Sequence, residues 1–359
     1  MKPCVRKLHR YVGLTMLALW LIQAATGVLM VFHWELGDSL VPGPARAVDV
    51  AAISRRVATL SVVRPGSRVT SVFATGGAAD RYEIFIEDPR GRTDVLKIDG
   101  AGTVLDERPS DYNYLKAGVI ETAVVLHQSL FAGDTGRRLL GVSALVLLAS
   151  VVVGVTLAWP ARATWRRALA PWTVRSPAAR RYAWHRAIGL WLAAPALLFI
   201  GAGMLLAFDD PLEALLSAAP QPPVAVAAFT GTPDPQLAIE TALARFPGAT
   251  LTSVKMPSAT QPWYRVRVLQ PGELRRVFGT TTINVGAQGG VLSIEDPRTA
   301  SWQRRFLDAT YPIHTGEFAG LPGRLLALAT GSLLLAAMVF GTLLWSQRRT
   351  TARQKSPDP

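Results

Sequence analysis

The sequence predicts a membrane protein with four transmembrane α-helices in two parallel repeats and with two small α+β domains between the helices. Half of the 359 residues are hydrophobic, and the mean hydropathy is +0.25. Four stretches of roughly 20 residues, the length of a membrane-spanning helix, carry almost no charge. Short histidine motifs in the first half of the chain recur in the second half.

The four apolar stretches are the predicted transmembrane helices. At a rise of about 1.5 Å per residue, each stretch is long enough to cross the roughly 30 Å hydrocarbon core. A backbone in lipid must satisfy its own hydrogen bonds, so we expect helices. The first stretch is longer than the apolar core of a signal peptide, and we expect it to remain in the protein. The stretches are residues 11–32, 139–159, 188–208 and 325–345.

The net charge of +13 indicates membrane topology rather than nucleic-acid binding. Basic residues are concentrated at the start of segment 1–32, in the connection 160–187 and in the tail 346–359. Cytoplasmic loops of membrane proteins carry an excess of Lys and Arg. We therefore expect a multi-pass protein of the bacterial inner membrane, with both termini cytoplasmic, the lipid bilayer as its surroundings and no nucleic acid as partner.

The two long connections, residues 33–138 and 209–324, are then expected on the periplasmic side, each as a small α+β domain. Alternating apolar residues predict strands, and a helical pattern precedes them in each connection. The first connection contains an expected helix at 51–60 and strands at 68–73, 81–87, 94–99 and 103–105. The second contains an expected helix at 235–245 and strands at 263–269, 276–285 and 291–294.

Four of the five histidines lie in motifs that occur twice. Because both halves start on the same side, the repeat is parallel, about an axis along the membrane normal. We therefore expect His9 to face His185 at the cytoplasmic edge and His127 to face His314 at the outer edge. The motifs are Leu8-His9-Arg10-Tyr11-Val12-Gly13-Leu14, Trp184-His185-Arg186-Ala187-Ile188-Gly189-Leu190, His127-x3-Phe131-Ala132-Gly133-x2-Gly136-Arg137 and His314-x3-Phe318-Ala319-Gly320-x2-Gly323-Arg324.

Paired imidazoles at membrane depth are typical axial ligands of haem. We expect two haem b groups, one between His9 and His185 and one between His127 and His314. Iron with two histidine ligands is six-coordinate, which suits electron transfer. No C-x-x-C-H motif is present, so ligation and packing alone would hold the haem. The alternative is that these histidines anchor the helix ends at the membrane surface.

Two glycines stand one helical turn after the cytoplasmic histidines. Gly13 follows His9 by four residues and Gly189 follows His185 by four, so each pair shares a helix face. A glycine there would leave a flat area for a porphyrin ring. The alternative is that these glycines let neighbouring helices pack closely.

Arg137 and Arg324 end the outer histidine motifs and are candidates to bind the haem propionates, since a guanidinium matches a carboxylate. Binding of lipid headgroups is the alternative for both. His33 is the one histidine without a repeated partner, because its counterpart in the second half is Asp209. We expect an accessory role at most for His33, either near a substrate or as a substitute ligand.

The repeated motifs resemble those of the PepSY-associated transmembrane family, in which four transmembrane helices carry two PepSY-type exported domains. The segment Asp99-Gly100-Ala101-Gly102-Thr103-Val104-Leu105 adds weaker support, since it is similar to the strand–turn–strand of a PepSY domain. The resemblance covers nearly the whole chain. It implies an iron-regulated inner-membrane protein, and for some members a haem-bearing ferric-siderophore reductase.

The function expected from these features is an inner-membrane di-haem reductase. Electrons would enter at the His9/His185 haem, pass to the His127/His314 haem and reduce a periplasmic acceptor, a ferric siderophore, releasing Fe(II). No dinucleotide-binding or P-loop motif is present, so a separate cytoplasmic flavoprotein or quinol would donate the electrons. The alternatives are a non-catalytic periplasmic binding or regulatory module anchored by four helices, and a transporter.

Overall fold

The computed structural model describes residues 2–109, 118–218 and 234–354. Parts of the two expected periplasmic domains, 110–117 and 219–233, and the end of the expected tail, 355–359, lie outside the described residues. The chain divides into two compact units. The helical unit comprises Met1–Val31, Ala123–Asp209 and Ile313–Pro359, and the sheet unit comprises Phe32–Thr122 and Asp210–Pro312.

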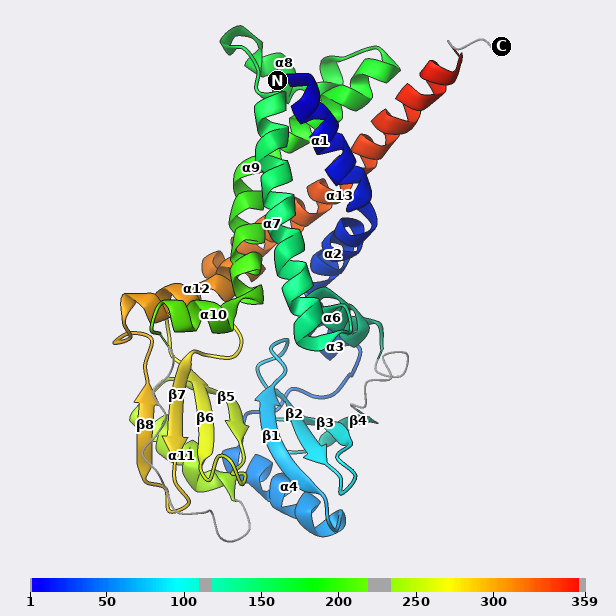
Figure 1. Cartoon of the computed structure of the whole chain (residues 1–359). Helices are drawn as coiled ribbons and strands as arrows, with labels where there is room; N and C mark the ends of the chain where they lie inside the picture. The colour runs from blue at the N-terminus through cyan, green and yellow to red at the C-terminus, as the bar shows by residue number, and fades with distance from the viewer. Residues whose placement is uncertain (1, 110–117, 219–233, 355–359) are drawn as a thin grey trace. The chain divides into compact units, whose positions relative to one another are not determined.

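The helical unit contains the predicted transmembrane segments (Figure 1). Among the described residues, three helices are long and apolar enough to cross a membrane, and a bent pair supplies a fourth if it counts as one span. The helices of this unit are α1 (Lys2–Thr15), α2 (Leu17–Met30), α6 (Val119–Ser129, which begins in the sheet unit), α7 (Gly133–Ala158), α9 (Pro177–Ala207) and α13 (Gly320–Gln354). The connection between α7 and α9 forms the short helices η1 (Arg162–Thr164), α8 (Trp165–Leu169) and η2 (Pro171–Thr173).

The first predicted span is not one straight helix. It is divided at Met16 into α1 and α2, which are bent by 64°. The hydroxyl of Thr15 donates to the carbonyl oxygens of Tyr11 and Val12 at 2.9 and 3.0 Å. A Ser or Thr side chain that bonds back to its own helix in this way often bends it.

Within the helical unit, α9 packs against both α7 and α13, and α13 also packs against α2. Small residues make this close packing possible, as Ala196 of α9 is fully buried beside Ile188 and Leu192. By contrast, α7 exposes Leu139 and Leu145, which are 57% and 56% accessible. A helix that is apolar on its outer surface as well is expected of a membrane span.

The sheet unit contains one eight-stranded sheet in the order β4-β3-β2-β1-β5-β6-β7-β8. All neighbouring strands are antiparallel. The first connection supplies β1 (Arg68–Ala74), β2 (Arg81–Glu87), β3 (Thr93–Asp99) and β4 (Val104–Pro109). The second supplies β5 (Thr250–Lys255), β6 (Tyr264–Leu269), β7 (Thr281–Val285) and β8 (Val291–Glu295).

The two connections, each expected to form its own α+β domain, share this sheet because β1 pairs with β5. That pairing removes two sheet edges, which would otherwise present unpaired backbone groups. The strand β5 was not predicted from the sequence. A strand was predicted at 276–285, but β7 begins only at Thr281 because Glu273 holds the preceding connection, accepting from the backbone and hydroxyl of Thr280 at 2.6 and 2.7 Å.

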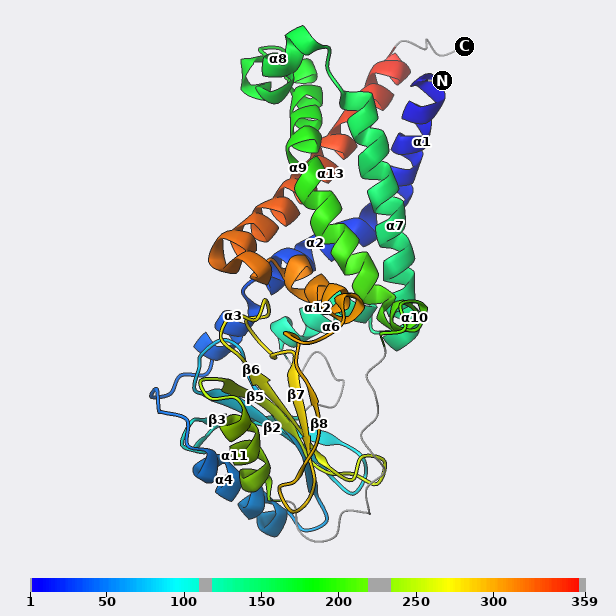
Figure 2. The same ribbon diagram turned by 90° about the vertical axis from the view of Figure 1, so that its left-hand side faces the viewer.

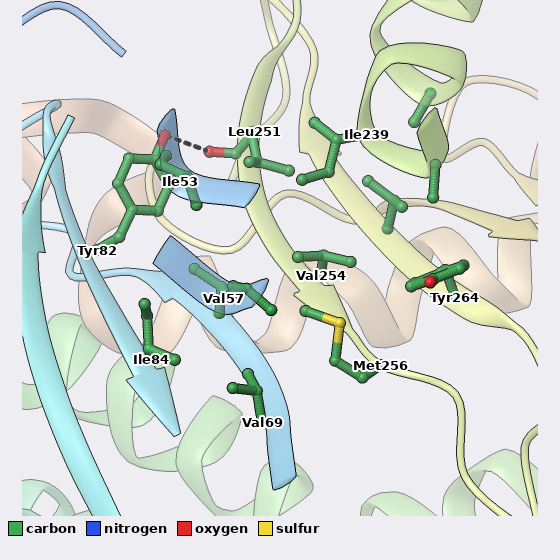
Figure 3. Close-up of a cluster of buried hydrophobic side chains, with 14 of the residues drawn as sticks. Ile53, Val57, Val69, Tyr82, Ile84, Ile239, Leu251, Val254, Met256 and Tyr264 are labelled. Carbon is green, nitrogen blue, oxygen red and sulfur yellow. Dashed lines mark hydrogen bonds between the residues drawn. The ribbon is translucent and has the colours of Figure 1, made fainter. Parts of the chain in front are cut away.

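Two helices cover one face of the sheet, α4 (Val50–Val63) and α11 (Pro235–Arg245) (Figure 2). An aspartate caps each helix: Asp49 accepts from the backbone of Ala52, and Asp234 accepts from that of Gln236, both at 3.0 Å. The apolar residues under both helices form one continuous core, shown in Figure 3. Its members include Ile53, Val57, Val69, Tyr82, Ile84, Ile239, Leu251, Val254, Met256 and Tyr264.

The remaining described helices are α3 (His33–Ser39), α10 (Asp209–Leu215), α12 (Trp302–Thr315) and η3 (Glu317–Ala319). The chain between Asp209 and Ile313 starts and ends in the helical unit, so α10 and α12 are the elements at which it leaves and returns.

Replacement of Ile84 by Ala should destabilise the sheet unit by about 2–5 kcal/mol, because Ile84 is fully buried in the shared core. Limited proteolysis of the sheet unit during urea unfolding would measure this change. Val62→Ala is the control: this side chain is 78% exposed on α4, so its loss should change stability by less than about 0.5 kcal/mol. Equal effects of the two substitutions would contradict the assignment of the core.

The hydroxyl of Tyr82 donates to the carbonyl oxygen of Leu251 at 3.3 Å and so links the two halves of the sheet. Burial, followed by the charge of Asp80, raises the pKa of Tyr82 to about 12 from its usual 10.0. The folded state therefore holds this proton more tightly than the unfolded state does. The contribution of this proton to the free energy of unfolding is fully present below pH 10 and is lost as the pH rises towards about 12. Tyr82→Phe should reduce this loss and remove one group from the tyrosinate absorbance titration near pH 12; a Tyr82 that ionises near pH 10 would contradict the prediction.

Candidate functional site

Two pairs of histidine rings meet in the helical unit. The ring centroids of His9 (α1) and His185 (α9) are 6.4 Å apart, and their planes make an angle of 54°. Those of His127 (α6) and His314 (α12) are 6.1 Å apart, at 27°. Each pair joins one histidine from each half of the chain, and the partners are those that the repeat predicted.

In the first half of the chain, a hydroxyl group lies at Nδ1 of each paired histidine. His9 Nδ1 is 3.2 Å from Ser150 Oγ on α7, and His127 Nδ1 is 3.0 Å from Thr26 Oγ1 on α2. The hydroxyl of Thr26 donates to the carbonyl oxygen of Ile22 at 2.7 Å, so it accepts from His127, which carries its proton on Nδ1. Ser150 can donate or accept, so its bond orients the ring of His9 without fixing which nitrogen carries the proton.

In the second half, a backbone carbonyl occupies the same place. His185 Nδ1 is 2.9 Å from the carbonyl oxygen of Ala337 on α13, and His314 Nδ1 is 2.8 Å from that of Phe199 on α9. A carbonyl oxygen only accepts, so Nδ1 carries the proton in both neutral rings and the lone pair lies on Nε2. Histidines that bind metals through one nitrogen commonly donate from the other in this way.

Glycines allow the outer pair of rings to lie directly against helix backbones. A Cβ added at Gly27 would lie 3.0 Å from Cε1 of His127, and one added at Gly203 would lie 2.5 Å from Cε1 of His314. Any other residue would push the rings away. Gly27 and Gly203 each follow a histidine of the cytoplasmic motif by 18 residues. They therefore make room for the histidines at the other end of the unit, His127 and His314.

The inner pair has the same arrangement, with two glycines that were not predicted from the sequence. A Cβ at Gly154 would lie 3.2 Å from Cε1 of His9, and one at Gly341 would lie 3.2 Å from Cε1 of His185. Ser150 and Ala337, the hydrogen-bond partners of these histidines, each stand four residues before the glycine. Gly154 and Gly341 are 187 residues apart, the same spacing as His127 and His314, and this spacing could have identified them.

Gly13 and Gly189 lie beside open space. No atom lies within 4 Å of a Cβ built at either position, apart from their own chain neighbours and helix backbone. Close helix packing at these two positions, the alternative considered from the sequence, is not what the structure shows. Their role towards a porphyrin stays a prediction.

Each histidine pair has the spacing of a two-imidazole metal site. A nitrogen ligand lies about 2 Å from a bound metal, so two rings on opposite sides of one ion have centroids roughly 6 Å apart. A haem iron takes its remaining ligands from the porphyrin, so two imidazoles suffice. Among the described residues no group of three or more His, Cys, Asp or Glu side chains could hold a bare metal ion.

The two pairs lie at opposite ends of α9. His185 is in one pair, and Gly203 contacts the other pair. At about 1.5 Å per residue, these positions are about 27 Å apart along the helix. The pairs are thus separated by nearly the thickness of a membrane core.

The two arginines expected at the haem propionates bind protein groups. Arg137 forms ion pairs with Asp209 at 2.8 Å and with Asp134 at 3.1 Å. Arg324 is 5% exposed and donates to the carbonyl oxygen of Val31 at 3.2 and 2.6 Å, beyond the C-terminal end of α2. Both guanidiniums therefore fix the ends of helices, which a sequence motif alone does not reveal.

His33 belongs to neither pair. It begins α3 in the sheet unit, and its ring lies 4.4 Å from that of Trp34. The structure brings together the four repeated histidines and leaves the fifth elsewhere.

Comparison with known proteins gave one family. The PepSY-associated TM region family matches residues 6–348, nearly the whole chain. No curated protein matches the chain. The match, together with the apolar helices, indicates a multi-pass membrane protein.

Gly203→Ala should lower the thermal stability of the helical unit, because the added methyl group would overlap the His314 ring and break its bond to Phe199. Overpacking of this kind costs about 1–3 kcal/mol. Gly201→Ala on the same helix is the matched control: apart from its own helix, no atom lies within 4 Å of the added Cβ, so its thermal stability in detergent should be equal to that of the parent or slightly higher. If both variants unfolded like the parent protein, the ring would not lie against α9.

Proposed function

Because the chain belongs to the PepSY-associated TM region family, we propose that it is an inner-membrane haem b reductase with two haem sites. It would carry electrons from a cytoplasmic flavoprotein or from quinol to a periplasmic acceptor. We propose a ferric siderophore as the acceptor: one electron converts Fe(III) to Fe(II), for which the hard oxygen donors of a siderophore are poorer ligands. The basic N-terminus, 160–187 connection and tail would face the cytoplasm.

One observation carries the proposal: each of the two histidine pairs has the spacing of a two-imidazole iron site. Structural histidines would not need to meet in pairs at both ends of one bundle. A simple membrane anchor for the sheet unit would not need them either.

The surrounding residues prepare the rings for ligation. The carbonyl oxygens of Phe199 and Ala337 keep the protons of His314 and His185 on Nδ1. Ser150 and Thr26 hold the other two rings. Bound haem would supply one-electron transfer, and two histidine ligands leave no open position for dioxygen.

His314→Ala and His9→Ala should each reduce the haem content of the purified protein from two groups per chain to one, because each pair holds one group. The haem content and the dithionite-reduced minus oxidised spectrum measure this, in protein produced with an ample haem supply. His33→Ala is the control and should leave both unchanged.

A colourless parent protein would overturn the proposal and favour an anchored binding or regulatory module. Unchanged haem content in both His314→Ala and His9→Ala would show that these pairs are not the ligands. Substrate flux into proteoliposomes without any redox change would favour a transporter.

A further inference from the structure

The face of the sheet opposite to α4 and α11 carries a row of basic side chains in its second half. Arg265 and Arg267 alternate with buried residues along β6 and so point to this face. Lys255 of β5 lies directly opposite Arg265 in the strand register. Cross-strand partners share a face, so the three cationic groups are neighbours. We call them the basic row.

The strand register shows that this charge is not a general property of the face. Residues Lys97, Glu83, Phe73, Ser253, Arg267, Thr282 and Glu295 face one another in turn across the sheet. In the first half, Glu83 stands opposite Lys97, so opposite charges meet. In the second half, Arg267 stands between Ser253 and Thr282, which carry no charge.

In the first half of the sheet, carboxylates form ion pairs with the basic side chains of this face. Lys97 forms an ion pair with Asp38, and Arg108 forms one with Glu83, both at 3.0 Å. Among the described residues, none forms an ion pair or hydrogen bond with the side chain of Lys255 or Arg267. The basic row thus has excess positive charge where the equivalent strands of the first half are balanced.

The positive charges of Lys255, Arg265 and Arg267 repel one another. Partial desolvation, followed by the charges of Arg267 and Arg265, lowers the pKa of Lys255. Burial, followed by the charges of Arg275 and Arg265, lowers the pKa of Arg267, and Glu295 opposes this only in part. Bringing these groups together therefore costs free energy, which a bound anion would recover.

An uncharged rim borders the basic row. Asn284 accepts from the indole of Trp263 at 3.1 Å and from Nε of Arg265 at 3.4 Å, which fixes both side chains. Towards the first half, the ring of Phe73 makes edge-to-face contacts with Phe85 and Phe278, with centroids 5.8 Å apart in each case. Aromatic surface next to guanidinium groups suits an anion that also has an apolar part.

We infer that Lys255, Arg265 and Arg267 form the binding site of a negatively charged ferric chelate, one whose free carboxylate or catecholate oxygens face the guanidinium groups. This inference rests on the proposed function for the identity of the ligand. The guanidinium groups would make charge-assisted hydrogen bonds to the chelate, and the neighbouring aromatic rings would contact its apolar parts. A neutral ferric chelate would lack the first of these interactions.

Equilibrium binding to the full-length protein in detergent tests the inference, with ferric dicitrate as the anionic probe and ferric tris(acetohydroxamate) as the neutral probe. The double variant Arg265→Gln/Arg267→Gln should weaken ferric dicitrate binding by about tenfold or more, the effect of losing a charge-assisted contact. The control Arg55→Gln/Arg245→Gln removes the same charge from exposed positions on α4 and α11, which cover the other face, and should leave binding unchanged.

Two further variants distinguish a loss of binding from a loss of folding. Lys255 is exposed, and Lys255→Gln should weaken ferric dicitrate binding severalfold without affecting the fold. Arg265→Lys/Arg267→Lys keeps the charge and should retain more affinity than the glutamine pair. Binding of ferric dicitrate by the parent protein should weaken with added salt, and binding of the neutral probe should not.

Failure of this inference and failure of the proposed function are distinguishable. If the protein contains haem but ferric dicitrate binds the parent and the glutamine variants equally, or does not bind, the basic row is not the chelate site. If the protein is colourless but the glutamine variants lose ferric dicitrate binding, the site stands and the reductase proposal fails.

Discussion

The close approach of each histidine ring to a helix backbone is the interaction on which the arrangement of the helical unit depends. An imidazole can hydrogen-bond a helix carbonyl such as that of Phe199 only if the residue one turn further, Gly203, has no side chain. The same geometry recurs at Ala337 and Gly341. The position and orientation of the His314 and His185 rings follow from this requirement.

The two halves of the chain repeat this geometry but not its chemistry. Hydroxyl groups hold the first-half histidines, whereas carbonyl oxygens hold those of the second half. In the sheet unit the charges of the first half are paired and those of the basic row are not. The two halves thus share backbone positions but differ in the side chains at several matched positions.

Local pattern predicted much of the fold. Three of the four apolar stretches correspond to single long helices and the first to the bent pair α1 and α2, and β2 and α11 have the expected bounds. The failures come from specific contacts and bends that the hydropathy pattern does not contain. The strand β5 is fixed by pairing with β1, far away in the sequence, and the start of β7 is fixed by the contacts of Glu273. The first apolar stretch bends by 64° at Met16, which no hydropathy pattern registers.

The sequence by itself determined which residues form the long apolar helices and which histidines are partners, because length, hydropathy and repeat spacing are properties of the chain alone. Only the tertiary structure decided what surrounds those histidines. Hydrogen-bond partners such as Ser150, and the ion pairs that engage Arg137, come from elements distant in the sequence. The single sheet formed by both connections also depends on residues that are distant in the sequence. The unpaired backbone groups at the edge of one strand form hydrogen bonds with whichever strand the folded chain places beside it.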